Sequence, residues 1–166
     1  MTTNDHIGQH MTTNGMSNEE LKNKILAICP DAEVTEGKQF LNATVPGKKL
    51  HEVALKLRDS KDLAFDYLTC LTGADFPEYM TVIYHLESTL YRHMMVLRAN
   101  TADRENPVLD TVSDIWPTAD FHEREVYDLL GVRFANHPDL RRLLLWEGWG
   151  YPLRKDYVDE VRIVDR

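Results

Sequence analysis

Three segments in the middle of the chain alternate apolar residues with others at a period of two, the spacing of a β-strand that buries one face. They cover residues 64–71, 80–86 and 91–97. Only a short turn separates the second segment from the third, which predicts that these two strands pair antiparallel. The chain is therefore expected to build a sheet and to bury one of its faces.

Two amphipathic helices are predicted before these strands. The first should begin at Ser17, an N-cap residue followed three positions later by Glu20, and Pro30 should end it. The second should run to about Asp59, because its apolar residues recur at helical spacing. These residues are Leu50, Val53, Ala54 and Leu57.

A β-hairpin should lie between the two helices. Residues 32–35 and 39–45 have the composition of strands, and Gly37 lies in the turn between them. Together with the later strands, this predicts an α+β fold: one mainly antiparallel sheet with helices packed on it, plus an extended C-terminal arm. The predicted divisions are a disordered N-terminal tail at 1–16, the α+β domain at 17–131 and the arm at 132–166.

The composition excludes several classes of protein. A formal net charge of −8 argues against a surface that neutralises phosphates, so nucleic acid is not an expected partner. Cys29 and Cys70 are far apart in the sequence and suit reduced structural thiols of a cytosolic protein. The N-terminus lacks the apolar core of a secretory signal, and no later run approaches the roughly 20 apolar residues of a membrane span. A soluble chain is expected, with membrane association only through partners.

The sequence has none of the common short motifs for cofactor binding or nucleophilic catalysis. It contains no GxxxxGK[ST], GxGxxG, GxSxG or CxxC pattern. His51 and His122 each precede a glutamate, as in a zinc-protease helix, but the residue four positions later is not histidine. His85 and His93 are expected to be ordinary residues of neighbouring strands, because the spacing suggests no third metal ligand.

A densely charged helix is predicted from about Asp120 to Gly131, where glycine can end it in a left-handed conformation. Glu123 is expected to act as a capping-box partner. Glu123 and Glu125 point about 200° away from each other, so they cannot share a substrate. Arg124 can pair with the acids four positions before and after it, which favours a solvated or partner-facing ion-pair network over a catalytic pair.

The chain changes character after Gly131. Residues 134–157 are rich in aromatic residues, leucine and arginine, are punctuated by glycine and proline, and have neither helical nor strand periodicity. Tryptophan, tyrosine and arginine dominate protein interfaces, and an extended arm that carries them can wrap a neighbouring protein. The alternative is that the arm folds back over its own sheet.

The motifs of this region resemble those of a known family. Residues 123–134 read ERExYDxxGxxF, residues 137–142 read HPDLRR, and residues 152–157 read PLRKDY. This combination closely resembles the signature of the thirty-kilodalton subunit of respiratory complex I, which is also known as its C subunit. The family generally has histidine where Tyr151 stands, and the loop before Tyr151 is slightly shorter than usual.

The resemblance implies a cofactor-free structural and assembly subunit in the peripheral arm of a proton-pumping NADH:quinone oxidoreductase. FMN and the iron–sulfur clusters would be held by other subunits, which agrees with the lack of clustered cysteines. The implied partners are the quinone-site subunit and the terminal-cluster subunit. The implied location is the cytoplasmic face of the bacterial inner membrane, as a peripheral protein, with NADH and quinone bound elsewhere in the complex.

The resemblance also places the partner interface on the charged helix and the arm, with no catalytic, cofactor-binding or metal-binding residue in this chain. The arginines there are expected to pair with partner carboxylates, because arginine suits partly buried interface pairs. The residues of the expected interface are Glu123, Arg124, Glu125, Tyr127, Asp128, His137, Pro138, Arg141, Arg142, Trp149, Pro152, Leu153, Arg154, Lys155 and Asp156.

Two other functions fit parts of the sequence. The equivalent subunit of a membrane-bound hydrogenase or of a ferredoxin-dependent quinone reductase would keep the same arm, and this chain does not reveal the electron donor. A free-standing hydrolase would have to use Glu125, Asp128 and His137.

Overall fold

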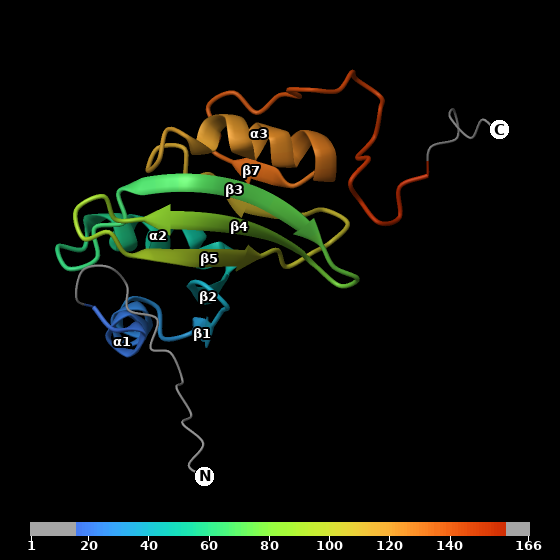
Figure 1. Cartoon of the computed structure of the whole chain (residues 1–166). Helices are drawn as coiled ribbons and strands as arrows, with labels where there is room; N and C mark the ends of the chain where they lie inside the picture. Colours follow the sequence, from blue (N-terminus) through green and yellow to red (C-terminus); the bar gives the residue numbers. More distant parts are fainter. Residues whose placement is uncertain (1–15, 159–166) are drawn as a thin grey trace, which may run out of the picture.

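The computed structural model describes residues 16–158 (Figure 1). In chain order its elements are α1 (Asn18–Ile28), β1 (Glu33–Glu36), β2 (Leu41–Pro46), the 3-10 helix η1 (Gly47–Lys49), α2 (Leu50–Asp59), β3 (Tyr67–Asp75), β4 (Met80–Glu87), β5 (Met94–Asn100), β6 (Val108–Asp110), α3 (Ala119–Leu130) and β7 (Arg133–Ala135). The predicted α+β class is confirmed, and the predicted helices and alternating strands recur within a few residues of their expected bounds.

Helix α1 begins as the sequence predicts. The Ser17 side chain accepts a hydrogen bond from the backbone N–H of Glu20, and the Glu20 carboxylate accepts one from the backbone N–H of Ser17. Both halves of the capping box are therefore present. Cys29 forms the C-cap, one residue before Pro30.

A five-stranded sheet in the order β1-β2-β5-β4-β3 forms the body of the domain. Strands β1 and β2 make the predicted hairpin, and β4 pairs antiparallel with both β3 and β5. Strands β2 and β5 pair in parallel, because α2 and the β3–β4 hairpin are inserted between them in the sequence. The sheet is mainly antiparallel, as expected, with one parallel pair inside it.

The core lies on one face of this sheet. Ala43, Leu97, Tyr84 and Leu71 follow one another across four strands in register, and all four are buried. Helices α1, α2 and α3 contribute their apolar residues to the same cluster. Figure 1 shows α2 behind the strands and α3 beside β3. Within residues 16–158 the helices thus form one layer, which leaves the other face of the sheet open.

Helix α3 packs closely on β3 because Gly73 has no side chain. A Cβ added at Gly73 would lie 2.4 Å from Leu130 Cδ1 and 3.1 Å from Val126 Cγ1. Since real Cβ contacts are longer than this, any larger residue would have to displace the Leu130 side chain and press on Val126. The close approach positions the polar face of α3 next to the chain that follows it.

The structure adds a second, two-stranded sheet that the sequence does not predict. Strands β6 and β7 pair in parallel over three residues each, which is too short for an alternating pattern to be recognised. Because β7 follows residue 132, the first part of the expected arm belongs to the domain. Met16, the last residue of the expected tail, packs against the core. The remaining tail residues, 1–15, and the last arm residues, 159–166, lie outside the described range.

Candidate functional site

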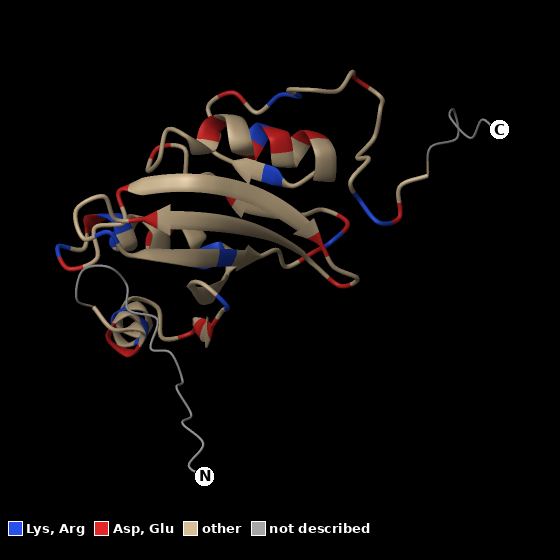
Figure 2. Cartoon of the chain, viewed as in Figure 1, with Lys and Arg blue, Asp and Glu red and all other residues tan. Residues whose placement is uncertain are grey.

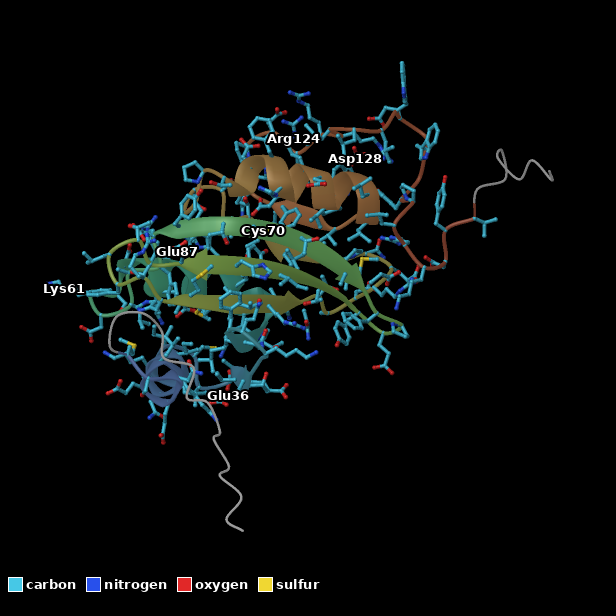
Figure 3. The ribbon with its side chains drawn as sticks, in the orientation of Figure 1. Glu36, Lys61, Cys70, Glu87, Arg124 and Asp128 are labelled. Atoms are coloured by element: carbon cyan, nitrogen blue, oxygen red, sulfur yellow. The ribbon has the colours of Figure 1, made fainter. Side chains whose placement is uncertain are left out.

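Helix α3 carries two carboxylates that the fold buries completely. The side chains of Glu123 and Asp128 have no exposed surface, although the sequence predicted a helix whose charges face solvent or a partner. Figure 2 shows the charged residues of α3, and Figure 3 shows Arg124 and Asp128 on the helix. The prediction is wrong for these two acids, because segments distant in the sequence cover them.

Glu123 does not cap its own helix, which corrects a second prediction. Thr118 occupies the N-cap and makes no side-chain cap hydrogen bond. The Glu123 carboxylate instead accepts hydrogen bonds from the Thr111 hydroxyl and, at 2.8 Å, from the backbone N–H of Val112. Burial raises the pKa of Glu123 to about 7, and these two hydrogen bonds lower it only in part.

His137 lies beside this carboxylate. Its Nε2 is 3.8 Å from Glu123 Oε2 and 3.5 Å from Asp120 Oδ1, and its side chain is buried. Its Nδ1 accepts a hydrogen bond from the backbone N–H of Asp139 at 3.0 Å, so a neutral imidazole carries its proton on Nε2, which faces the two acids. The His-Pro-Asp turn is therefore fixed against the first half of α3.

Asp128 fastens the arm to the second half of α3. Its Oδ2 accepts hydrogen bonds from three consecutive backbone N–H groups, those of Leu143 at 3.0 Å, Leu144 at 2.6 Å and Leu145 at 2.9 Å. Its Oδ1 accepts one from Arg142 Nη1 at 2.8 Å. Burial acts to raise the pKa of Asp128, but these hydrogen bonds outweigh it and hold the pKa below its usual value. We call this contact, between Asp128 and residues 142–145, the Asp128 clasp.

Further along the arm, Tyr151 lies between two arginines. The guanidinium carbons of Arg142 and Arg154 are 5.3 Å and 4.9 Å from the centre of its ring, within the range of cation–π attraction. Arg154 Nε also donates to the carbonyl of Leu130 at 2.7 Å. Gly131 ends α3 with φ of 78°, and a Cβ there would lie 2.8 Å from the Tyr151 ring. The left-handed backbone conformation of residue 131 and the lack of room for a Cβ atom beside Tyr151 both require glycine at this position.

The end of the described arm is tied to the end of β3. Arg104 donates to both oxygens of Asp75, at 2.9 Å and 2.8 Å, and to Asp156 at 3.0 Å. The backbone N–H of Lys155 donates to Asp75 at 2.8 Å. Burial acts to raise the pKa of Asp75, but Arg104 and the Lys155 N–H outweigh it and the pKa is lowered. The arm thus folds back over its own domain, which is the alternative that the sequence left open (Figure 1).

The arm that is held in this way exposes large apolar side chains. Trp146 is 80% exposed, Leu144 is 60% exposed, and Leu153 is exposed to a similar extent. Exposed apolar residues that gather in one segment mark sites where another molecule binds. We call Leu144, Trp146 and Leu153 the apolar arm surface.

The four arginines that were expected to bind partner carboxylates all have contacts within the chain. Arg142 and Arg141 pair with the carboxylates of Asp128 and Asp139, and Arg124 and Arg154 donate to backbone carbonyls. Arg142 therefore positions the arm, whereas Arg141 is exposed and its pairing with a partner stays a prediction. Among the other residues of the expected interface, Pro138, Leu153, Lys155 and Asp156 are exposed, and Glu125, Tyr127, Trp149 and Pro152 are half-buried.

The three residues that a hydrolase would need are not brought together. Both oxygens of Asp128 are occupied by the clasp, and His137 lies against Asp120 and Glu123 rather than Glu125. Within residues 16–158, no group of three histidine, cysteine or acidic side chains could hold a metal ion. None of the helices in that range has the length and apolar character that crossing a membrane requires.

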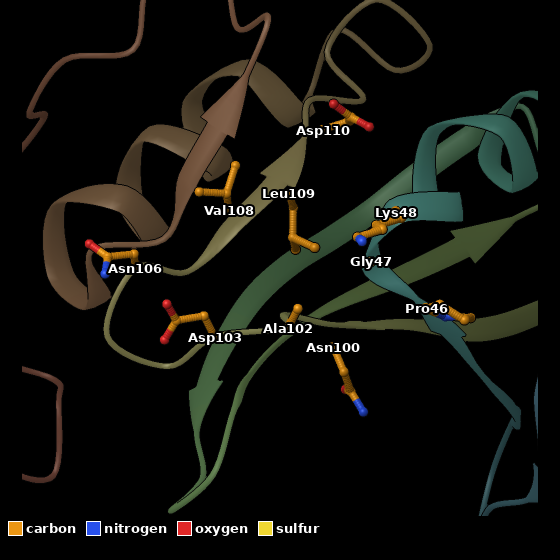
Figure 4. A pocket seen from close by; sticks show the side chains of 10 residues that line it. All are labelled: Pro46, Gly47, Lys48, Asn100, Ala102, Asp103, Asn106, Val108, Leu109 and Asp110. Atoms are coloured by element: carbon orange, nitrogen blue, oxygen red, sulfur yellow. The ribbon is translucent and has the colours of Figure 1, made fainter.

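A hollow of about 520 Å³ lies where η1 meets β6 and the end of β5 (Figure 4). Pro46, Val108 and Leu109 supply apolar walls, and Lys48 and Asp103 supply charge. None of the ten described residues that line it is a histidine, cysteine, serine or threonine. Its described lining therefore lacks a hydroxyl or thiol nucleophile and an imidazole base.

The fold and the site define a small α+β domain whose own buried acids hold a C-terminal arm across it. Residues 43–161 match the family described as the 30 kDa subunit of respiratory-chain NADH dehydrogenase. The chain belongs to this family, so the resemblance seen in its arm is confirmed.

Similar proteins carry related names. The C/D subunit of the NADH-quinone oxidoreductase of Phocaeicola vulgatus is 54% identical over 115 residues, which cover 68% of this chain and 22% of that protein. The C subunit of the enzyme of Roseiflexus castenholzii is 36% identical over 148 residues, which cover 85% of this chain and 84% of that protein. The chain spans about a fifth of the length of the C/D relatives that it matches.

Two solved structures have the same fold. The trypsin-resistant fragment (1–134) of Nqo5 superposes with a TM-score of 0.62 and 29% identity, covering 74% of this chain and 98% of that one. A chain of the membrane-bound sulfane sulfur reductase, an archaeal respiratory membrane complex, superposes with a TM-score of 0.71 and 26% identity, covering 86% of each chain.

Proposed function

We propose that this chain is a structural and assembly subunit, without a cofactor of its own, in the peripheral arm of a proton-pumping NADH:quinone oxidoreductase. Electrons would pass from NADH to quinone through FMN and iron–sulfur clusters held by other subunits. The family and the names of the relatives support this class of complex.

The observation that carries the proposal is the Asp128 clasp together with the apolar arm surface. The clasp fixes the backbone of residues 143–145 in the segment that presents Leu144 and Trp146 to the outside. Burial of each such side chain against a partner contributes roughly 1.5–3 kcal/mol. Because the arm is already ordered on its own domain, binding loses less conformational entropy than the ordering of a free segment would cost.

The partners we propose are the quinone-site subunit and the terminal-cluster subunit, bound at α3 and the arm. The C/D names of several relatives join a C part and a D part in one chain, which supports direct contact with a D-type protein. As a peripheral protein, the chain would reach the cytoplasmic face of the inner membrane only through these partners.

A related function is favoured by one observation. The chain of the sulfane sulfur reductase, a respiratory membrane complex whose name does not include NADH, superposes over most of its length. A chain of this fold can therefore serve a complex with another electron donor, such as a hydrogenase or a ferredoxin-dependent quinone reductase. The proteins that co-purify with the chain separate these cases.

The decisive experiment is to tag the full chain in its own cells, solubilise the membranes in mild detergent and purify the tagged protein. We expect a large assembly that absorbs visible light through flavin and iron–sulfur clusters and oxidises NADH. An assembly that lacks an NADH-oxidising subunit would support the related function. Recovery of the chain alone, without colour, would contradict the proposal.

Arg141 provides a second test of the same proposal. Its side chain is exposed and its partner in this chain, Asp139, is also exposed, so Arg141→Ala should change the stability of the isolated chain by less than about 1 kcal/mol. The variant should nevertheless be recovered in the assembly in a smaller amount than the wild type. Arg58→Ala, which removes an arginine paired with Asp59 on α2, is the matched control. Equal incorporation of Arg141→Ala and wild-type chains would count against an interface at Arg141.

A further inference from the structure

The open face of the sheet carries a second candidate site, away from α3 and the arm. Its residues alternate with the core residues along each strand, and two rows of them cross the sheet in register. One row is Cys70, His85, Val96 and Asn42, and the next is Thr72, Ile83, Arg98 and Thr44. The turn between β1 and β2 borders this face and brings Lys38 and Phe40 to it.

Most of these residues, though not Cys70 or Thr44 at the ends of the two rows, line a hollow of about 510 Å³, which is within the range of ligand and peptide pockets. Ten described residues line it. Lys38 and Arg98 are cationic, His85 can bind a proton, and none of the ten is acidic. The chain as a whole has a formal charge of −8. The hollow is therefore a local exception to the charge of the protein, and it attracts negative groups that most of the surface repels. We call it the basic pocket.

Two nitrogen atoms of the basic pocket have no hydrogen-bond partner among the described residues. Arg98 Nε and His85 Nδ1 are both buried, although parts of their side chains reach the surface. Buried nitrogen atoms are almost always hydrogen-bonded in folded proteins, so each such exception calls for a missing partner. Ile83 stands opposite Arg98 and Val96 opposite His85 in the register of β4 and β5, so the two basic side chains lie on adjacent rows.

The apolar residues of the basic pocket favour a peptide over a free anion as its ligand. Val96 is only 5% exposed although it lies on the open face, and Ile83 is half-buried beside it. The Phe40 ring meets the His85 ring edge-on, with 6.4 Å between their centres. A small hydrated anion would leave these groups without contacts, whereas a peptide can place a carboxylate on Arg98 and an apolar side chain on Val96 and Phe40.

We propose that the basic pocket binds an acidic segment of a partner protein, with a carboxylate held by Arg98 and His85. The chain would then lie between two partners, one on the arm and one on the open face of the sheet. This inference requires the multi-subunit assembly of the proposed function, but it does not depend on which partner the arm binds.

Cys70 supplies a natural probe for this proposal. Figure 3 labels Cys70, which is exposed on β3. It lies directly opposite His85 in the strand register, whereas Cys29 is buried in the core and serves as an internal reference. The rate at which a maleimide modifies Cys70 should be measured in the isolated full chain and in the purified assembly. A photoreactive cross-linker attached to Cys70 should then identify the neighbouring peptide by mass spectrometry.

If the proposal is correct, the assembly slows the modification of Cys70 by at least about tenfold, and the cross-linked peptide belongs to another protein of the assembly and contains aspartate or glutamate. Arg98→Glu, and more mildly Arg98→Gln, should restore fast modification while the arm's partners still co-purify. Lys61→Gln removes an exposed cation outside the basic pocket and should have no effect. Replacing the cross-linked acid by arginine should rescue Arg98→Glu.

Three results would overturn the proposal. They are equal modification of Cys70 in the isolated chain and the assembly, a cross-link to this chain itself or to a peptide without acids, and full protection of Cys70 in Arg98→Glu. In each of these cases the assembly is intact, so the result contradicts the proposed ligand of the basic pocket and not the proposed function. Recovery of the chain without any partner would instead contradict the proposed function, and this inference with it.

Discussion

Asp128 of α3 and Arg142 of the arm form an ion pair of 2.8 Å between Oδ1 and Nη1, and the Asp128 side chain is fully buried. Because the other oxygen of Asp128 accepts hydrogen bonds from three backbone N–H groups, one side chain fixes residues 142–145 of the arm on α3. The arm in turn determines where Leu144 and Trp146 stand. Two of the residues expected to bind a partner, Asp128 and Arg142, thus hold the arm instead, and the arm exposes Leu144 and Trp146, which the sequence did not single out.

Asp128→Asn should release the arm without unfolding the domain. The amide cannot accept hydrogen bonds on both sides, and each hydrogen bond to a charged group contributes roughly 1.5–3 kcal/mol. Arg142 should then be cleaved by trypsin much faster, whereas Arg154 and Lys155 remain tied to Leu130 and Asp75 and should not. The main unfolding transition should change little, because the arm opens locally. Limited proteolysis of the isolated chain measures this. Glu125→Gln, a change of the same kind on the same helix, should keep the wild-type cleavage rate, and equal rates for Asp128→Asn would mean that the clasp does not hold the arm.

Glu123 should make the folded protein less stable as the pH rises. Its folded pKa of about 7 exceeds the unfolded value near 4.5, so the folded state holds the proton more tightly between these values. Its contribution to stability is full below about pH 4.5 and falls by roughly 3 kcal/mol as the pH rises to 7. Urea unfolding at pH 5 to 8 should show a smaller decline for Glu123→Gln than for the wild type.

Asp114, Asp120 and His137 lie near Glu123 and are present in both proteins. The contribution of Glu123 is therefore the unfolding free energy of the wild type minus that of Glu123→Gln at each pH. Glu125→Gln, which removes one charge from a half-buried residue of the same helix, is the control for net charge. Parallel stability curves for the wild type and Glu123→Gln would show that Glu123 stays ionised in the folded protein.

Trp146→Ala should affect assembly but not the fold. The side chain is 80% exposed, so the unfolding free energy of the isolated chain should change by less than about 0.5 kcal/mol. Loss of a tryptophan from the centre of an interface commonly weakens binding by about 2 kcal/mol or more. The amount of variant recovered in the purified assembly measures this. Leu90→Ala removes a similarly exposed apolar residue outside the arm. Normal assembly of Trp146→Ala would exclude the apolar arm surface as an interface.

Arg104→Met should destabilise the domain strongly. It leaves the buried Asp75 carboxylate with the Lys155 N–H as its remaining described donor, and breaking a buried ion pair costs roughly 3–5 kcal/mol. The pKa of Asp75 is lowered by Arg104 in the wild type, so this stabilisation is present above the usual pKa of aspartate and is lost as the pH falls.

The melting temperature of Arg104→Met should accordingly be about 10 °C lower than that of the wild type at pH 7, and the difference should shrink at acidic pH. Arg58→Met provides the comparison, because its pair with Asp59 is near the surface and should be worth less than about 1 kcal/mol. A difference that stays constant down to pH 3 would show that the charge of Asp75 is not involved.

Local patterns determined much of this fold from the sequence alone. The start of α1 follows from Ser17 and Glu20, the end of α3 from Gly131, and the alternation along β4 and β5 from the period of two. Each of these depends on residues that are close in the sequence, so local backbone preference and the need to bury one face are sufficient to predict them. The long motif of the arm identified the family for the same reason.

Only the tertiary structure decided what the charged residues of α3 do. In the sequence, Glu123 has the position of a capping residue and Asp128 that of a surface acid. In the fold their partners are the N–H of Val112 and those of residues 143–145, which lie 11 to 17 positions away. Backbone N–H groups are the same in every residue except proline, so such contacts leave no pattern in the sequence. The pairing of β6 with β7 and the unsatisfied nitrogen atoms of the basic pocket likewise depend on how distant segments pack.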